Sequence, residues 1–256
     1  MNHNEYITTG FSTLDEAIGG FRPAELIIIG GRPAMGKSAM MISMMLNMTN
    51  LHKISSVVFS LGKPVEEMAR RMIKGMQEPY AEMPWLNLIY IDDTPSLSIT
   101  ALREKCLRLK AEKNIQVVFI DYLQLLTLDD GTDRTLSETA CMEQLLKSLK
   151  AIARELELPV VVSSQLECSR DIGPKQPTLE NFRESASVVR QLADKILFIY
   201  RPEYYYVGDD DNDNSLKGHT EIIIAKCAGC AVESIALRFD KECGRFFCEL
   251  TDFGSM

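Results

Sequence analysis

Short apolar runs alternate with helical stretches along most of this chain. Most of the runs lack polar and apolar alternation, a pattern typical of strands that are buried on both faces. The predicted strands cover residues 26–30, 56–60, 88–91, 117–121, 160–164, 195–200 and 220–226. Because strands and helices alternate, we expect an α/β fold with a mostly parallel central sheet and helices on both faces.

Capping residues mark the helix boundaries. Ser12-Thr13-Leu14-Asp15 is a capping box that predicts a helix start, and Gly19-Gly20 predicts where that helix ends. A second capping box, Thr135-Leu136-Ser137-Glu138, opens a stretch whose apolar residues share one face, at positions 142, 145, 146, 149, 152, 153 and 156. The methionines at 40, 41, 44, 45 and 48 predict a packed helix face.

The C-terminal part of the chain departs from this alternation. Only a loop separates the runs at 220–226 and 234–239, so we expect an antiparallel hairpin at the end of the sheet. Residues 208–214 (GDDDNDN) are acidic and turn-forming, and we expect a loop there. Since no repeat and no clean boundary is visible, we expect residues 1–256 to form a single domain with a flexible tail at 1–8.

Composition narrows the class of protein. The chain has 256 residues, of which 46% are hydrophobic, and a chain of this size buries roughly three quarters of its unfolded surface. Its net charge of −8 excludes a histone-like polybasic protein, so a nucleic-acid partner must be held by a local basic surface. No secretory signal opens the chain, and the apolar helical run at 39–48 is shorter than the ~20 residues of a membrane span. We therefore expect a cytoplasmic protein without a membrane partner, whose 7 cysteines are thiols.

Residues 31–38 match the phosphate-binding pattern G-x-x-x-x-G-K-[ST] between a predicted strand and a helix. Backbone N–H groups of such a loop surround phosphate oxygens, and the helix N-terminus adds partial positive charge. We expect Lys37 to reach the β- and γ-phosphates of ATP and Ser38 to bind Mg²⁺. The predicted nucleotide-binding residues are Gly31, Arg32, Pro33, Ala34, Met35, Gly36, Lys37 and Ser38.

Two further polar residues stand at the ends of predicted strands. Asp121 ends the apolar strand at 117–121, which is the form of a Walker B strand whose aspartate orients Mg²⁺. Gln165 follows 160–164 and should lie on the same carboxyl edge of the sheet, where it could sense the γ-phosphate. An ordinary strand-end hydrogen bond is a nearly equal interpretation of Gln165. With the phosphate loop, Asp121 predicts ATP and Mg²⁺ as cofactors.

Several motifs resemble, in the same order along the chain, the RecA-like motor domain of DnaB-type replicative DNA helicases. They are RPAMGKS at 32–38, DYLQL at 121–125, SQL at 164–166, RES at 183–185 and FIYR at 198–201. The resemblance covers residues 9–247. It implies a ring-forming ATPase, for example a homo-hexamer, that translocates on single-stranded DNA and separates the duplex in DNA replication.

The resemblance also implies roles for residues outside the phosphate loop. Arg71 matches an arginine that contacts the nucleotide, and Lys226 matches a catalytic lysine. Arg183, Glu184 and Ala186 match the loop that follows DNA phosphates. Without the resemblance, Arg183 and Glu184 would be interpreted as a solvated ion pair at a helix start.

Three positions depart from the family's pattern. Gly62 stands where the family has the glutamate that activates the attacking water, and losing a general base costs about 10²–10⁴-fold in rate. Glu66 or Glu67, one helical turn onward, could stand in for it. Ala228 stands at the arginine-finger position, and such a finger is worth about 10³–10⁵ in turnover. Ala186 replaces a glycine in the DNA loop, which is one residue longer than the pattern.

These departures leave three interpretations open. The first is an ATP-dependent helicase domain that hydrolyses slowly. The second is a catalytically impaired nucleotide-binding homologue that regulates or poisons an intact helicase in a mixed ring. The third interpretation is a zinc-stabilised module in which Cys227, Cys230, Cys243 and Cys248 are ligands, although Cys248 could instead pack in the core. Apart from these interpretations, we expect the family's N-terminal helical domain and linker helix to be missing.

Overall fold

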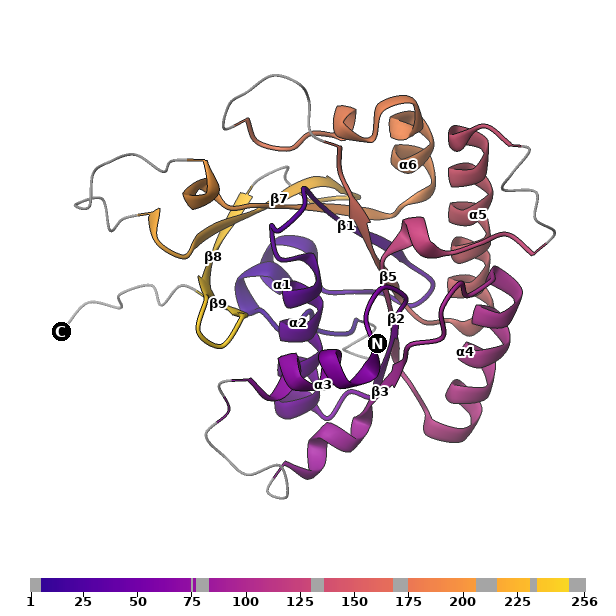
Figure 1. The fold of residues 1–256 in the computed structure, drawn as a ribbon, viewed down its shortest axis with the longest axis horizontal. Coiled ribbons are helices and arrows are strands. Elements are labelled where there is room, and N and C mark those ends of the chain that lie inside the picture. The colour runs from indigo at the N-terminus through magenta and orange to yellow at the C-terminus, as the bar shows by residue number, and fades with distance from the viewer. Residues whose placement is uncertain are drawn as a thin grey trace.

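One twisted sheet organises the molecule, and its six parallel strands precede three antiparallel ones (Figure 1). The computed structural model describes residues 6–74, 76, 83–129, 136–167, 175–205, 216–230 and 234–248. Within these residues the strand order is β3-β2-β4-β5-β1-β6-β7-β8-β9. The strands are β1 Leu26–Gly31, β2 Ser56–Ser60, β3 Ile89–Asp92, β4 Val117–Asp121, β5 Val160–Gln165, β6 Lys195–Tyr200, β7 His219–Cys227, β8 Ser234–Asp240 and β9 Arg245–Cys248.

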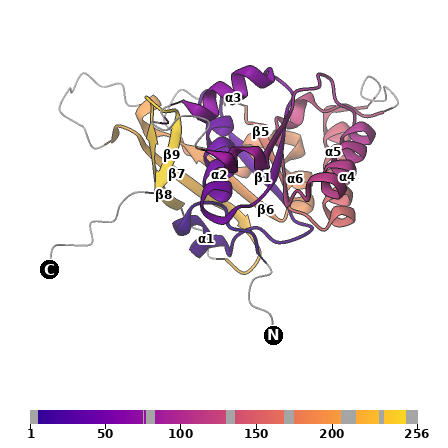
Figure 2. The same ribbon diagram turned by 90° about the horizontal axis from the view of Figure 1, so that it is seen from below.

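Helices cover both faces of the parallel strands, as Figure 2 shows from below. The α-helices are α1 Ser12–Ile18, α2 Lys37–His52, α3 Val65–Ile73, α4 Ile99–Lys113, α5 Glu138–Leu156 and α6 Ala186–Leu192. The central strand β1 explains why alternation is absent from the sequence. Ile27 and Ile29 pack on the side of α1 and α2, whereas Leu26 and Ile28 pack on the side of α4 and α5. Each face of the sheet therefore has its own apolar core.

The described strands confirm the predicted pattern and add to it. The predicted limits of β2, β4 and β6 are those of the structure. The predicted hairpin is confirmed as β7 and β8, and Arg245–Cys248 adds a third antiparallel strand that was not predicted. All five clustered methionines of α2 are buried. The acidic segment 208–214 lies outside the described residues.

The N-terminal prediction was partly wrong. Ser12 lies inside α1 and Phe11 is the N-cap, with no side-chain cap. Asp15 instead accepts hydrogen bonds from the Thr8 hydroxyl and from the Thr9 N–H, at 2.6 Å for the latter. A carboxylate satisfied by the preceding loop cannot close a capping box. Of the predicted tail, residues 6–8 are described, and Ile7 pairs with Phe21.

The second predicted cap is displaced by two residues. Helix α5 begins at Glu138, and Ser137 caps it by accepting a hydrogen bond from the Ala140 N–H. Thr135 lies outside the described residues. In the described part of the chain, no helix is long and apolar enough to cross a membrane.

The cysteines correct another expectation. Cys227 and Cys230 form a disulfide across the turn after β7, where their Cα atoms are 5.4 Å apart, a separation that suits a disulfide. Cys243 and Cys248 are free, and Cys248 packs against the core. No cluster of three or more potential metal ligands of the His, Cys, Asp or Glu type exists among the described residues, so the zinc interpretation has no support there.

Candidate functional site: a cationic cavity over the phosphate loop

The phosphate loop connects the end of β1 to the start of α2. Ala34 and Gly36 have φ angles of 65° and 97°, so the chain twice enters the left-handed region within this turn. Such a reversal points successive N–H groups to one side and forms a cradle for an anion. Helix α2 begins at Lys37 without a side-chain cap, which leaves its first N–H groups for a ligand.

Lys37 lies folded over this loop. Its Nζ donates hydrogen bonds to the carbonyls of Gly31 and Arg32, at 2.8 and 3.1 Å. Burial lowers the pKa of Lys37 from 10.5 to about 8, while Asp121 opposes this shift and Lys63 adds to it. Because burial destabilises the charged form of this amine, a nearby phosphate would stabilise that form strongly.

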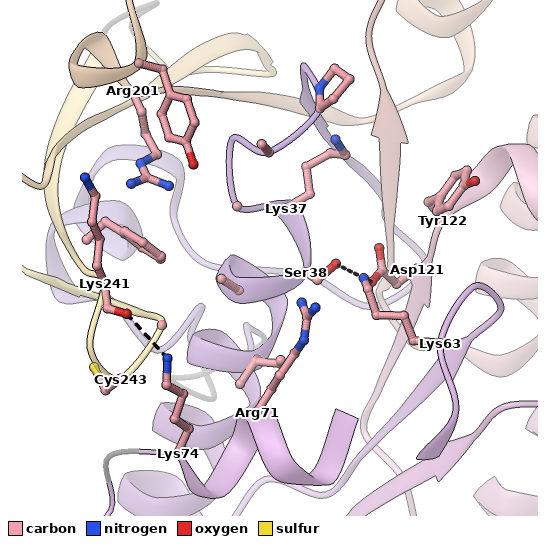
Figure 3. A pocket seen from close by; sticks show the side chains of 18 of the residues that line it. Lys37, Ser38, Lys63, Arg71, Lys74, Asp121, Tyr122, Arg201, Lys241 and Cys243 are labelled. Carbon is pink, nitrogen blue, oxygen red and sulfur yellow. Dashed lines mark hydrogen bonds and ion pairs between the residues drawn. The ribbon is translucent and has the colours of Figure 1, made fainter. Parts of the chain in front are cut away.

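Asp121 ends β4 beside the loop, in register with Ser60 at the end of β2. Its Oδ1 accepts a hydrogen bond of 2.7 Å from the Ser163 hydroxyl. Its Oδ2 faces Lys63 at 3.6 Å, and Lys63 Nζ also donates to Ser38 Oγ at 2.9 Å. The Lys63 ammonium therefore lies between Ser38 and Asp121 (Figure 3).

These residues line a cavity of about 630 Å³, which is within the size range of small-molecule sites. Its described lining includes six cationic side chains and one carboxylate, that of Asp121. The cations come from four regions: the phosphate loop, the segment after β2, the segment after β6, and the connection between β8 and β9 (Figure 3). They are Lys37, Lys63, Arg71, Lys74, Arg201 and Lys241. This excess of positive charge favours an anionic ligand.

The far wall of the cavity is aromatic and cationic. Arg201 follows β6 and is only 2% exposed; its guanidinium lies 3.9 Å from the centre of the Phe239 ring and 4.7 Å from that of Tyr204. It pairs with Glu203, which also pairs with Lys241 at 3.2 Å. The Nε of Arg201 is buried without a hydrogen-bond partner among the described residues.

The sequence and the fold match those of known proteins. The family of the DnaB-like helicase C terminal domain matches residues 6–83 and 79–248. This chain belongs to that family. A probable replicative DNA helicase of Trieres chinensis is 36% identical over 265 residues, which cover 94% of this chain and 57% of that protein. The replicative DNA helicase DnaB of Geobacillus stearothermophilus is also 36% identical, over 94% of this chain and 56% of that protein.

Solved structures agree with this assignment. A DnaB-like replicative helicase, described with its interactions with primase, gives a TM-score of 0.79 at 29% identity, over 94% of this chain and 61% of that one. A second solved structure, described as an ATPase domain, gives a TM-score of 0.79 at 27% identity, over 96% of this chain and 93% of that one. The chain has the RecA-like fold of these helicase domains, and it spans a little over half the length of the curated relatives.

Within this DnaB-like domain, the predicted loop residues divide between cavity and scaffold. Pro33, Ala34, Gly36, Lys37 and Ser38 line the cavity. By contrast, Met35 is in the core, and the Arg32 guanidinium donates to the Tyr205 hydroxyl at 2.7 Å. The Gly31 carbonyl receives Lys37.

The other predicted nucleotide contacts are brought to the same place. Gln165 lies in register with Gly31 and lines the cavity, and its N–H donates to Gln124 Oε1 at 3.3 Å. Arg71 lines the cavity and pairs with Glu67 at 2.6 Å. Glu66 and Glu67 do not belong to the described lining, which argues against either as a substitute base.

Lys226 and Ala228 lie away from this cavity. Lys226 Nζ donates to the carbonyls of Arg190 and Ala193, both at 2.5 Å, and so satisfies carbonyls at the end of α6. Burial lowers the pKa of Lys226. Ala228 lies in the turn closed by the Cys227–Cys230 disulfide.

The predicted DNA loop contains a strained residue. Arg183 has φ 51° and ψ −128°, a combination that glycine adopts readily and other residues rarely. Its side chain is exposed and pairs with Glu167. Glu184 immediately follows, and Ala186 begins α6.

Sequence reasoning missed several lining residues. Arg201 and Tyr204 follow the parallel strand β6, and Lys63 follows β2, so the rule that ligands bind at carboxyl ends of strands could have found them. Lys74 lies at the C-terminal end of α3, where that rule does not apply. Lys241 lies between β8 and β9 and depends on the hairpin folding back over the loop. The missed residues include Lys63, Lys74, Arg201, Tyr204 and Lys241.

Proposed function

We propose that this domain binds ATP in the cationic cavity. The observation that carries the proposal is the convergence of six cationic side chains on a phosphate loop at the start of an uncapped helix. Phosphate groups are stabilised by helix N-terminal N–H groups and by Lys and Arg side chains together. Among these cations, Lys37 contacts the loop carbonyls that frame the cradle.

The aromatic wall supports a nucleotide that extends from the loop. Arg201, Tyr204 and Phe239 lie together on the side formed by the antiparallel strands. Planar bases stack on aromatic rings and on guanidinium planes. With the triphosphate over Lys37, the base would face this wall.

We further propose that the domain acts on single-stranded DNA as part of a replicative-helicase ring. The relatives named as replicative DNA helicases support this activity, which uses ATP to translocate and to separate the duplex. Arg183, Glu184 and Ala186 would contribute the DNA-facing loop. The ring would be one of identical copies, for example a homo-hexamer, in which each copy meets the next through one repeated interface.

The second candidate is a catalytically impaired homologue that assembles with an intact helicase. One observation favours it: Gly62 has no proton-accepting side chain, and neither Glu66 nor Glu67 belongs to the described cavity lining. One such subunit would impair two neighbouring ATP sites in a mixed ring. Its own ATP site would lack the base. The neighbouring subunit's ATP site, which the arginine finger of this subunit would reach, would lack the arginine at position 228.

Mg²⁺ at Ser38 and Asp121 stays a prediction, and the arrangement of these residues fits the ion poorly. The hydroxyl and carboxylate are oxygen ligands of the kind Mg²⁺ prefers. The Lys63 ammonium, however, contacts both of them. We therefore assign no catalytic step to a metal.

Single-turnover hydrolysis of bound ATP separates the two candidates. The measurement is made with and without single-stranded DNA, for the chain and for Gly62→Glu combined with Ala228→Arg. Turnover of the chain within about 1–100 s⁻¹ would support an active helicase domain. Tight binding with negligible turnover, partly restored in the double variant, would support the impaired homologue. In the second case, excess chain should slow unwinding by an intact family helicase with which it co-assembles.

A further inference from the structure

Lys63 brings a positive charge to the point between the phosphate-loop serine and the strand-end aspartate. Its Nζ lies 2.9 Å from Ser38 Oγ and 3.6 Å from Asp121 Oδ2, and it lines the cavity (Figure 3). The Asp121 side chain is 5% exposed, so its carboxylate is nearly removed from water. A buried carboxylate needs a cation or several donors, and Lys63 supplies the cation.

The backbone around Lys63 is fixed by bonds that do not involve its ammonium. The Ser60 hydroxyl donates to the Lys63 carbonyl at 2.8 Å, and the Leu61 N–H donates to the Asp121 carbonyl at 3.0 Å. Pro64 follows as the N-cap of α3. The connection between β2 and α3 is thus tied to β4, and it aims the Lys63 side chain at Asp121.

A lysine ammonium can provide the positive charge needed between Ser38 and Asp121, but it binds its neighbours differently from a metal ion. It has three N–H donors and no need of a closed oxygen shell. Ser38 accepts one of these donors, and Asp121 faces the ammonium at 3.6 Å as an ion pair, which leaves donors for phosphate oxygens in the cavity. Mg²⁺ would have to bind the same two oxygens directly or through water, within a few ångströms of a second positive charge.

We propose that the Lys63 ammonium takes the place of the divalent cation, so that the cavity binds a nucleoside triphosphate without metal. This inference rests on the proposed binding of ATP. The positive excess of the cavity lining also suits the bare triphosphate, which carries more negative charge than its magnesium complex. An ammonium neutralises charge without acting as a Lewis acid, so tight binding would be accompanied by weak catalysis.

The test compares ATP affinity in excess EDTA with that in excess Mg²⁺, by calorimetry on the full chain. We expect ATP to bind at least as tightly in EDTA as in Mg²⁺, because the Lys63 ammonium supplies the ion's charge and magnesium in solution competes for the free triphosphate. Lys63→Met should weaken binding in EDTA by about tenfold or more, the value of one hydrogen bond to a charged group. Mg²⁺ should restore much of that loss, since the variant frees Ser38 and Asp121.

A matched control is Lys74→Met, which removes another cavity lysine that does not contact Ser38 or Asp121. In the unmodified chain, Lys74 Nζ donates a hydrogen bond to the Lys241 carbonyl at 3.4 Å. We expect it to weaken binding by the same factor with EDTA and with Mg²⁺. If Mg²⁺ changed the ATP affinity of the two variants by the same factor, the result would contradict the proposal that Lys63 takes the place of the ion.

The unmodified chain provides a second measurement that needs no variant. With saturating ATP, Mn²⁺ binding is followed by electron paramagnetic resonance. We expect the protein–ATP complex to bind Mn²⁺ no more tightly than free ATP does. Affinity gained by about tenfold or more in the complex, or ATP binding that requires Mg²⁺, would overturn the inference while leaving ATP binding intact. Absence of ATP binding in both conditions would instead overturn the proposed function, and the inference with it.

Discussion

The affinity of the domain for ATP should fall as the pH rises through 8. Burial lowers the pKa of Lys37 from 10.5 to about 8, with Asp121 opposing the shift and Lys63 adding to it. Bound phosphate favours the charged amine and raises this pKa again. Below pH 8 the amine already carries its proton, so binding requires none. Above it, binding must take up a proton, and this costs affinity.

The size of the effect follows from the fraction of protonated Lys37. With a pKa of about 8, roughly nine tenths of the amine is charged at pH 7 and roughly one tenth at pH 9. The dissociation constant should therefore rise about tenfold between these values, with uptake of about half a proton per ATP at pH 8. The terminal phosphate ionises near pH 6, about one pH unit below the lower end of this window. Burial raises the pKa of the Cys243 thiol, which also lines the cavity.

Calorimetry in two buffers of different ionisation enthalpy measures the proton uptake directly. Lys37→Arg is the matched control, because a guanidinium stays charged throughout this range. Whatever its absolute affinity, the arginine variant should show a flat pH profile. An affinity of the unmodified chain for ATP that is constant from pH 7 to pH 9 would refute the reasoning about Lys37, because the expected rise of about tenfold in the dissociation constant would be missing. A release of protons on binding would refute it as well.

Three further predictions concern stability and are checked by thermal unfolding. Arg183→Gly should raise the free energy of unfolding by about 1 kcal/mol, because relief of a strained φ outweighs an exposed ion pair with Glu167; a lower melting temperature would contradict it. Gly30→Ala should lower it by about 1–3 kcal/mol, since the new Cβ would lie 2.7 Å from the Phe198 ring, and an unchanged melting temperature would count against that packing. Lys226→Met should lower the free energy of unfolding by about 1 kcal/mol, because one exposed and one partly buried carbonyl lose a donor; a stability equal to that of the unmodified chain would show that the carbonyls find other donors.

The sequence predicted the parallel strands well because most of them are buried on both faces, the half-buried edge strand β3 being the exception. Strand β4, for example, is buried throughout and ends in the aspartate that was predicted to face the nucleotide. The phosphate loop was also readable, since its glycine and lysine spacing follows from the geometry of the turn itself. Local patterns sufficed where the local backbone decides the structure.

Contacts between distant segments could not be predicted in the same way. The carboxylate of Asp15 is satisfied by Thr8 and Thr9 in the preceding loop, and this competition defeats the capping box. The place of Lys63 depends on β2 lying next to β4, which is a property of sheet order and not of the segment around Lys63. Lys241 reaches the cavity only because the antiparallel strands fold back over α2.

Titration of ATP into the full chain, beside a Lys37→Met variant, tests the central claim most directly. We predict saturable binding that the variant weakens by about tenfold to a hundredfold, the value of hydrogen bonds and charge lost from a phosphate site. No saturable binding at millimolar ATP, or equal affinity of the chain and the variant, would contradict the assignment of this cavity to a nucleoside triphosphate.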